Sequence, residues 1–284
     1  MDNWLGDQTV LITGATSGIG KQAAIELAKH NTNLVFLARN LNKAKKTKLE
    51  IIKKSGNEKV NFYTVDLSSL NQIREFASKF TKEYHSLKIL INNAGMQTFR
   101  RQKTENGYEK TFTVNHLAYF LLTNLLLDKL IESRPSRIVN VSSGAHWKGK
   151  INFEDINFTK SIYNGVACYN QSKLANVMFT FYLADLLKDS GVIVNCLHPG
   201  KVRTNILKVF GLGKIFWKYN PFNLSPENGS ETIIYLATSN KINGVTGKYF
   251  VKKEIRNTSP ISKDKLQQEK LWKLSEEMVK FSIT

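Results

Sequence analysis

Short apolar runs alternate with longer amphipathic stretches along most of the chain. The apolar runs have the length of strands, and they fall near residues 9–12, 33–37, 60–65, 88–91, 137–141 and 192–197. The stretches between them have helical composition, as in Lys21 to His30, where Ala24, Leu27 and Ala28 share one stripe. This alternation predicts an α/β fold, a single doubly wound Rossmann-type domain whose parallel sheet carries helices on both faces.

Glycines concentrate in the turn after the first apolar run. That turn reads Thr13-Gly14-Ala15-Thr16-Ser17-Gly18-Ile19-Gly20, and a helical stretch follows it directly. A strand, a glycine turn and a helix make a dinucleotide-binding unit, because glycines let the backbone approach a pyrophosphate and the helix N-terminus attracts its charge. The spacing G-x-x-x-G-x-G differs from the common G-x-G-x-x-G, so the turn has the physical features of a dinucleotide-binding turn but not its usual glycine spacing. A glycine-rich turn without a ligand is the alternative interpretation.

Basic residues follow the second apolar run, at the place where NAD-binding proteins carry an acid that contacts the adenosine ribose. Asn31 to Leu49 contains no Asp or Glu, and Arg39 directly follows the predicted strand. A guanidinium binds a phosphate through paired, charge-assisted hydrogen bonds. The sequence therefore favours NADP(H) over NAD(H), with Arg39 as the contact. The lysines at 43, 45, 46 and 48 are interpreted as a solvated helix face.

Tyr169 and Lys173 are four residues apart in a stretch with helical composition. On a helix, such residues share one face at about 5–6 Å, so the amine can stabilise the phenolate and lower the pKa of the tyrosine. A tyrosine tuned in this way is equipped for general acid and base catalysis. A solvated surface pair is the alternative for an isolated Tyr-x-x-x-Lys.

Further motifs appear in a fixed order after the glycine turn. They are Asn92-Asn93-Ala94-Gly95, Asn115, Ser142-Ser143, Tyr169-x-x-x-Lys173 and His198-Pro199-Gly200. Together, these motifs resemble the short-chain dehydrogenase/reductase family over roughly residues 7 to 250. Within the family, the runs Tyr169-Asn-Gln-Ser-Lys173-Leu-Ala-Asn-Val-Met and Val-Asn-Val-Ser-Ser-Gly-Ala-His resemble the retinol dehydrogenase branch.

The resemblance implies four catalytic residues. Tyr169 would protonate a substrate carbonyl oxygen, while Lys173 would hold the nicotinamide ribose and lower the pKa of the tyrosine. Ser143 would orient the carbonyl, with the neighbouring Ser142 as its rival. Asn115 would bend or interrupt a buried helix and hold a water that links Lys173 to solvent. The alternative for Asn115 is a core asparagine whose hydrogen bonds are satisfied.

The resemblance also implies a set of cofactor contacts beyond Arg39, Tyr169 and Lys173. They are Gly14, Ser17, Gly18, Ile19 and Gly20 at the pyrophosphate, Asp66 and Leu67 at the adenine, Asn93, Ala94 and Gly95 along the adenosine, and Pro199, Gly200, Val202 and Thr204 at the nicotinamide. Asp66 has a compatible second role as the N-cap of a helix from Ser69 to Tyr84. Most of these residues follow directly after predicted strands, where doubly wound sheets bind ligands.

Two irregular segments flank the predicted chemistry. A long excursion separates Ser143 from Tyr169, and it would either wall a hydrophobic substrate pocket or cover a surface used for subunit pairing. Residues 204–224 mix large apolar side chains with lysines, which is typical of a lid over an apolar substrate. Peripheral contact of 204–222 with a membrane surface is the second hypothesis. We therefore expect a catalytic domain over 1–251, lid included, and a helical extension over 252–284 that packs on it. The apolar face of this extension would comprise Leu266, Leu271, Trp272, Leu274 and Met278.

The formal charge is +18, with 41 basic and 23 acidic residues. Lysines are scattered over many predicted helices without a nucleic-acid motif, so we rank nucleic acid below the cofactor and expect no nucleic-acid partner. Leu117 to Leu127 is too short to cross a bilayer and is expected to be a core helix. Two cysteines and five histidines show neither a disulfide framework nor metal spacing. The chain shows no secretory signal, so we expect a cytoplasmic protein, with membrane-surface association as the alternative.

These features together predict an NADP(H)-dependent oxidoreductase that interconverts a carbonyl and an alcohol on a hydrophobic small molecule. The alternative is a catalytically silent, NADP(H)-sensing regulatory protein on the same fold. The sequence assigns no particular substrate, no cellular direction of reaction and no oligomeric state.

Overall fold

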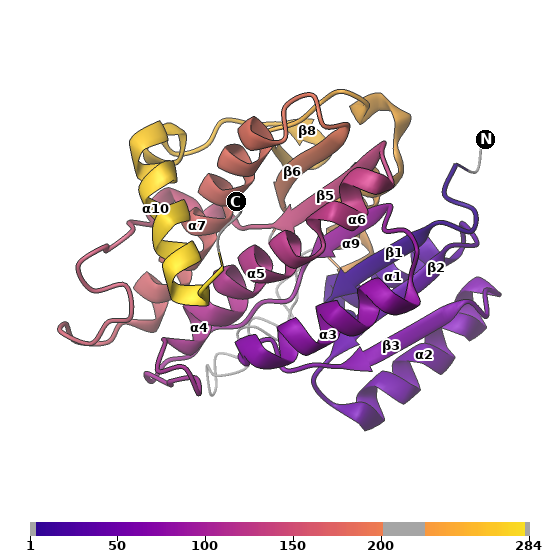
Figure 1. Cartoon of the computed structure of the whole chain (residues 1–284), viewed down its shortest axis with the longest axis horizontal. Coiled ribbons are helices and arrows are strands. Elements are labelled where there is room, and N and C mark those ends of the chain that lie inside the picture. Colours follow the sequence, from indigo (N-terminus) through magenta and orange to yellow (C-terminus); the bar gives the residue numbers. More distant parts are fainter. Residues whose placement is uncertain (1–3, 201–224, 282–284) are drawn as a thin grey trace.

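The computed structural model describes residues 4–200 and 225–281. Within these residues, the strands form one sheet in the order β3-β2-β1-β4-β5-β6-β7-β8, and every neighbouring pair is parallel except β7 and β8 (Figure 1). The strands are β1 Thr9–Thr13, β2 Asn33–Ala38, β3 Val60–Thr64, β4 Ile89–Asn92, β5 Ser136–Val141, β6 Val192–His198, β7 Lys248–Val251 and β8 Glu254–Ile255. The predicted α/β fold with a mostly parallel sheet is confirmed.

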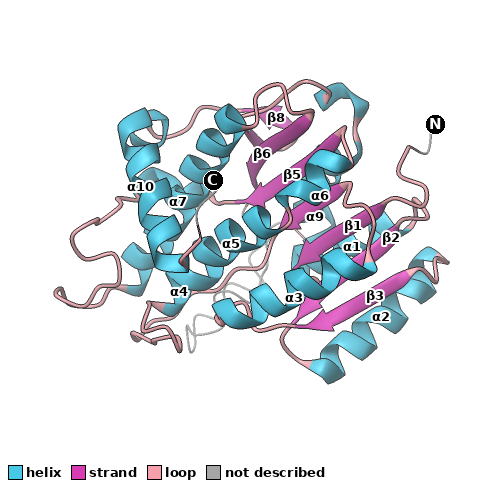
Figure 2. Ribbon diagram, viewed as in Figure 1, coloured by secondary structure: helices cyan, strands magenta, loops and turns pink. Residues whose placement is uncertain are grey.

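Helices connect the strands (Figure 2). The α-helices are α1 Gly18–Ala28, α2 Leu41–Ser55, α3 Leu70–Glu83, α4 Lys110–Phe112, α5 Ala118–Leu125, α6 Leu127–Glu132, α7 Gly165–Leu186, α9 Pro226–Thr238 and α10 Lys265–Val279. The shorter elements are the π-helical turn η1 Thr113–Leu117 and the 3₁₀ helices η2 Gly144–Lys148, η4 Asn240–Ile242 and η5 Pro260–Lys263. None of the helices within the described residues combines the length and the apolarity needed to cross a membrane.

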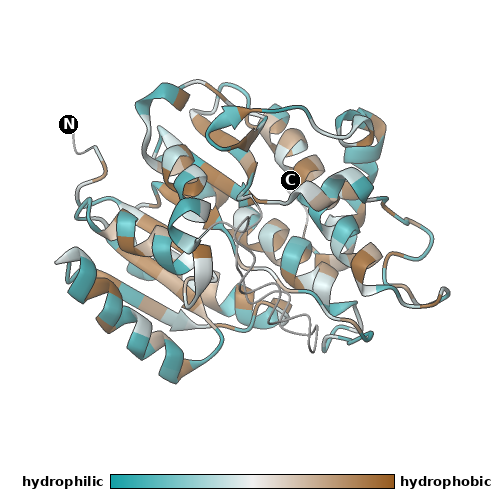
Figure 3. Cartoon of the chain, turned by 180° about the vertical axis from the view of Figure 1, so that it is seen from behind, coloured by the Kyte–Doolittle hydropathy of each residue, from teal (hydrophilic) through white to brown (hydrophobic). Residues whose placement is uncertain are grey.

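The sheet separates two hydrophobic cores. Val10 and Ile12 of β1 join the core that α1, α2 and α9 cover, whereas Leu11 joins the core beneath α3, α5 and α7. A strand whose side chains are buried on both faces has to be apolar at successive positions, which explains the unbroken apolar runs in the sequence. The strands are accordingly mostly brown in Figure 3, while the helices also carry hydrophilic residues.

The C-terminal helix α10 packs beside α7 and α5 (Figure 1). Asp264 caps its N-terminus by accepting hydrogen bonds from the amides of Leu266 and Gln267 at 3.0 and 3.1 Å. Trp272 is buried, and its ring lies 4.7 Å from that of Phe120. Leu266 was expected on the apolar face but is 78% exposed, because it lies in the first turn and points away from the core.

Two features of the chain's second half differ from the pattern of apolar runs. Strands β7 and β8 are short and extend the sheet beyond β6, with β8 at its edge, and the pattern of apolar runs predicts neither. Strand β8 continues the sheet past residue 251, where we placed the start of a purely helical extension. In contrast, the segment from Leu117 to Leu127 is a buried core helix as predicted, since residues 117 to 124 are all buried.

Candidate active site

The glycine turn joins β1 to α1 at the switch point of the sheet, where β1 has β2 on one side and β4 on the other. A Cβ atom on Gly20 would lie 2.3 Å from Asn93 Nδ2 and 2.5 Å from the carbonyl oxygen of Gly14. Gly14 itself has a φ of +71°, which favours glycine. Asn93 Nδ2 donates to the carbonyl oxygens of Thr13 and Gly14 at 2.9 and 3.2 Å. The Asn93 side chain therefore holds the backbone of the glycine turn in place.

The N-terminus of α1 is suited to an anion. Its N-cap, Ser17, has an extended backbone and makes no side-chain capping hydrogen bond, so the first amides of the helix remain available. The first turn, which includes Gly18 and Ile19, contains no acidic residue. A pyrophosphate fits this arrangement, because free amides and the helix dipole both attract negative charge.

Arg39 follows β2, the strand next to β1. It is exposed, and within the described part of the chain it makes no ion pair or side-chain hydrogen bond. Asn40 caps α2 by accepting from the amide of Lys43 at 2.9 Å, so Arg39 itself is not needed for the cap. The guanidinium is thus free to bind a phosphate.

Asp66 and Leu67 follow β3, and here one sequence-based alternative is wrong. The N-cap of α3 is Ser69, whose hydroxyl accepts from the amide of Gln72 at 3.3 Å. Asp66 instead accepts from the amide and the hydroxyl of Ser68 at 2.9 and 2.8 Å. The helix begins one turn later than a cap at Asp66 would require, and Asp66 orders the loop that precedes it.

Tyr169 and Lys173 both lie on α7, which Asn164 caps by accepting from the amides of Val166 and Ala167. Lys173 Nζ lies 5.7 Å from the centroid of the Tyr169 ring. Lys173 is buried, and its Nζ donates to the carbonyl oxygen of Val141 at 3.1 Å. The pair therefore faces the carboxyl end of β5.

The two candidate serines after β5 have different roles. Ser142 is buried, and its hydroxyl donates to the backbone oxygen of Lys173 at 2.7 Å. Ser143 caps η2 by accepting from the amide of Ala145 at 3.2 Å, and its side chain is near enough to Tyr169 to lower the pKa of that phenol. Of the two, Ser143 is the one that faces the tyrosine.

The pKa values of the pair differ from the sequence-based expectation. Burial raises the pKa of Tyr169 above its ordinary value, and the Ser143 side chain offsets this only in part. Burial lowers the pKa of Lys173 from 10.5 to about 7. The amine was expected to lower the pKa of the tyrosine, but burial removes much of its own positive charge near neutrality, so the desolvation of the phenol dominates.

Asn115 lies in η1, the π-helical turn between α4 and α5. The prediction that this residue interrupts a buried helix is confirmed. Its Oδ1 accepts from the amide of Met96 at 2.8 Å, and its Nδ2 donates to the Met96 carbonyl and to Ser172 Oγ, both at 2.9 Å. Asn115 thus joins the loop after β4 to helix α7, and its side chain also satisfies the description of a well-bonded core asparagine.

A buried carboxylate next to this site escaped the sequence analysis. Glu109 Oε2 accepts from the amide of Phe112 at 2.7 Å and from the thiol of Cys168 at 2.8 Å. Its Oε1 accepts from the hydroxyl of Tyr163 at 3.0 Å. Glu109 therefore fixes the excursion at Tyr163 to the turn of α7 that precedes Tyr169. No spacing in the sequence indicates this role, because Tyr163 and Cys168 lie more than 50 residues from Glu109 along the chain.

The other predicted contacts lie at the same edge of the sheet. Asn93, Ala94 and Gly95 follow β4, while Pro199 and Gly200 follow β6. A Cβ atom on Gly95 would lie 3.5 Å from Lys173 Nζ, which places this backbone beside the lysine. Val202, Thr204 and the predicted lid at 204–224, including the membrane-contact segment 204–222, lie outside the described residues.

The arrangement of this edge agrees with the comparison to known proteins. The family model described as short chain dehydrogenase matches residues 8–212. This chain belongs to the short-chain dehydrogenase family. Human retinol dehydrogenase 13 is 43% identical over 96% of this chain and 84% of its own, and human retinol dehydrogenase 14 is 40% identical over 96% and 86%. The chain is thus an oxidoreductase of the retinol dehydrogenase-like branch.

Solved structures show the same fold. An uncharacterized protein from Mycobacterium paratuberculosis matches with a TM-score of 0.80 and 30% identity, over 99% of this chain and 96% of its own. A short chain dehydrogenase from Escherichia coli CFT073, solved in complex with NADPH, matches with a TM-score of 0.69 and 22% identity, over 89% and 100%. The second likeness concerns the fold alone.

Proposed function

We propose that this protein is an NADP(H)-dependent oxidoreductase that interconverts a carbonyl and an alcohol on a hydrophobic small molecule, with Tyr169 as the general acid and base. The observation that carries the proposal is the placement of Tyr169 and Lys173 on one face of α7, with the buried Lys173 Nζ 5.7 Å from the centroid of the Tyr169 ring and the Ser143 side chain near enough to lower the pKa of the phenol. These groups lie at the edge of the sheet that also carries the glycine turn. A binding protein without turnover has no need for this constellation.

The chain's own residues supply the proton chemistry. NADPH, when bound, supplies the hydride that reaches the carbonyl carbon. The Tyr169 hydroxyl donates its proton to the carbonyl oxygen, and the Ser143 hydroxyl orients that oxygen with a second hydrogen bond. Lys173 has a pKa of about 7, so it gains a proton readily when a negative charge develops on the neighbouring phenol. Oxidation of the alcohol follows the same path in reverse.

Exposed apolar side chains favour a hydrophobic substrate. Trp147 follows Ser143 in η2, while Ile162 and Val166 precede Tyr169, and all three are exposed. The excursion that carries Ile162 is ordered by Asp155, which accepts hydrogen bonds from the amides of Lys160 and Ser161. Relatives named retinol dehydrogenases share 38–43% identity with this chain, so a retinoid-type aldehyde or alcohol is the first substrate to test.

A cofactor-oxidation assay tests the proposal. The purified protein is mixed with NADPH or NADH and a panel of short-chain, aromatic and retinoid aldehydes and ketones, and the loss of absorbance of the reduced cofactor is followed. We expect turnover with NADPH and with apolar carbonyls. NADPH binding in a fluorescence titration without turnover of any carbonyl or alcohol would instead support the sensing protein.

Arg39→Asp is expected to reverse the cofactor preference. The new carboxylate would repel the ribose phosphate of NADPH and accept a hydrogen bond from the free ribose hydroxyl of NADH. We expect kcat/KM for NADPH to fall by roughly 100-fold, about 3 kcal/mol for a lost charge-assisted pair and a new repulsion. Lys45→Asp changes the charge equally on the exposed face of α2 and is the matched control. An unchanged ratio of the two kcat/KM values in Arg39→Asp contradicts the assignment.

Gly20→Ala is expected to weaken NADPH binding. The added Cβ would lie 2.5 Å from the Gly14 carbonyl oxygen, so the backbone of the turn has to move and its amides no longer fit the pyrophosphate. We expect Kd, measured by the fluorescence of bound NADPH, to rise by roughly 10- to 100-fold, in line with the 1–3 kcal/mol that overpacking typically costs. Gly56→Ala introduces strain at the end of α2 without a clash and should leave Kd unchanged. Equal affinity of Gly20→Ala and the parent would exclude the turn as the binding element.

A further inference from the structure

His116 is a buried, titratable residue that the proposed chemistry does not use. It follows Asn115 in the π-helical turn η1 and is 1% exposed. Its ring lies 5.1 Å from the ring of Phe112 and 6.1 Å from that of Phe179 on α7. Burial lowers its pKa to about 3, so the imidazole is neutral at working pH and carries a single N–H.

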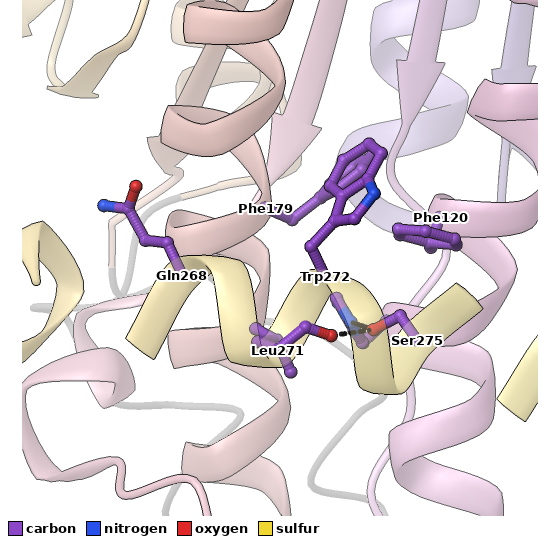
Figure 4. A pocket seen from close by; sticks show the side chains of 7 residues that line it. Phe120, Phe179, Gln268, Leu271, Trp272 and Ser275 are labelled. Atoms are coloured by element: carbon purple, nitrogen blue, oxygen red, sulfur yellow. Dashed lines mark hydrogen bonds between the residues drawn. The ribbon is translucent and has the colours of Figure 1, made fainter. Parts of the chain in front are cut away.

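The C-terminal helix α10 reaches this histidine. Nε2 of His116 lies 2.9 Å from the hydroxyl oxygen of Ser275, and the Ser275 hydroxyl also lies 2.8 Å from the carbonyl oxygen of Leu271, to which it can donate. Figure 4 shows Trp272 projecting from α10 toward Phe120 and Phe179, one turn from Ser275. Ser275 and Asn176 are thus the polar groups beside a histidine that is otherwise surrounded by aromatic rings, where an unpaired N–H would be costly.

A short path of hydrogen bonds leads from this turn to the catalytic tyrosine. Asn115, directly before His116, donates from Nδ2 to Ser172 Oγ at 2.9 Å. The Ser172 hydroxyl in turn donates to the backbone oxygen of Tyr169 at 2.7 Å. The orientation of η1 therefore affects the turn of α7 that carries Tyr169 and Lys173.

The π-helical turn needs external support. Its hydrogen bonds span one residue more than those of an α-helix, as in the bond from the amide of Ala118 to the carbonyl of Thr113. Such turns are rare, often occur at functional sites, and persist where the surroundings hold them. The side chains that surround His116 come from α4, α5, α7 and α10. Helix α10 lies beyond the stretch 8–212 that the family model matches.

We propose that His116 is a positioning residue, and that α10 supports catalysis by holding it through Ser275. The hydrogen bond between Ser275 and His116 holds η1 in place. The position of η1 in turn places the Asn115 side chain for its hydrogen bonds with Met96 and Ser172. This inference rests on the proposed function in so far as it assigns Tyr169 a catalytic role. The C-terminal helix would then contribute to the rate of turnover as well as to the packing of the fold.

Ser275→Ala tests the inference with two readouts. We expect kcat for carbonyl reduction to fall about tenfold with KM for NADPH unchanged, because displaced catalytic groups slow the chemical step and not cofactor binding. The solvent deuterium isotope effect on kcat should rise, since proton transfer from Tyr169 becomes slower. The second readout is amide hydrogen exchange at Met96, whose N–H is held by Asn115 Oδ1. We expect this exchange to accelerate at least tenfold.

Two further variants distinguish positioning from general support of the fold. Met278→Ala removes a buried side chain of α10 that does not line the pocket beside His116, and it should lower Tm while leaving kcat and Met96 exchange unchanged. His116→Gln keeps a donor near the position of Nε2 and should restore most of kcat, whereas His116→Phe should behave like Ser275→Ala. The inference is overturned if the Met96 amide of Ser275→Ala exchanges at the parent's rate. It is also overturned if Met278→Ala loses as much kcat as Ser275→Ala does. Absence of turnover in the parent overturns the proposed function alone, because the exchange readout does not depend on turnover.

Discussion

Tyr169→Phe is expected to lower kcat by roughly 10²- to 10⁴-fold, the range that a positioned general acid contributes. The variant loses only the hydroxyl, which lies near the Ser143 side chain and would hand its proton to the substrate oxygen. The ring remains, so the packing of α7 is preserved. Oxidation of NADPH by an aldehyde, followed at saturating substrate, measures the effect.

The control for this variant is a second phenol on the same helix. Tyr182 lies on α7 and packs against Trp272 at 5.0 Å, away from Ser143. Tyr182→Phe should retain the parent's kcat. Tyr182→Phe should also bind NADPH with the parent's Kd, and Tyr169→Phe should lose no more affinity than the one cofactor contact of its hydroxyl, since neither change touches the glycine turn. A Tyr169→Phe protein that reduces carbonyls at the parent's rate would show that another group supplies the proton.

The sheet and its ligand edge could be predicted because their signals are local. Each inner strand is buried on both faces, which leaves an apolar run in the sequence, as in Val10 to Ile12. The glycine turn could be found because Gly20 leaves no room for a side chain. Strands β7 and β8 lack such a signal, because they are short and include exposed positions such as Lys248, and β8 lies at the edge of the sheet.

The remaining errors concern properties that depend on the folded environment. The spacing of Tyr169 and Lys173 indicated that they share a helix face, but the direction of the tyrosine pKa shift depends on how deeply the site is buried. The roles of Ser142 and Ser143 could not be separated by sequence, because they differ only in which of them meets the backbone of α7. The network around Glu109 joins segments far apart in the chain, so no spacing reveals it.

Lys173→Met is expected to lower kcat by roughly 10²-fold or more. The methionine fills a similar volume but provides neither a charge beside the Tyr169 phenol nor a hydrogen-bond donor. A catalytic group that stabilises developing charge in a buried site typically contributes about 3–4 kcal/mol to the barrier. The same cofactor-oxidation assay measures this loss, and Lys188→Met, which removes an exposed lysine just beyond α7, is the control.

The same variant is expected to unfold at a higher temperature than the parent at pH 7. Burial lowers the pKa of Lys173 from 10.5 to about 7, so between these values the unfolded chain binds more protons than the folded one. The stability of the parent therefore rises with pH across this window, while the lysine weakens the fold most at pH 7 and below. Methionine carries no charge at any pH, and we expect a gain on the order of 2–4 kcal/mol at pH 7, after the loss of the hydrogen bond to Val141.

Thermal unfolding from pH 7 to 10.5, with no cofactor added, checks the sign of this effect. The difference in Tm between Lys173→Met and the parent should be several degrees at pH 7 and should shrink steadily as the pH approaches 10.5. Lys188→Met should show no such pH-dependent gain, because its lysine is exposed. A constant Tm difference across this range would mean that Lys173 keeps an ordinary pKa in the folded protein. The amine would then be fully charged at pH 7, and the proton affinity assigned to it during turnover would have to be revised.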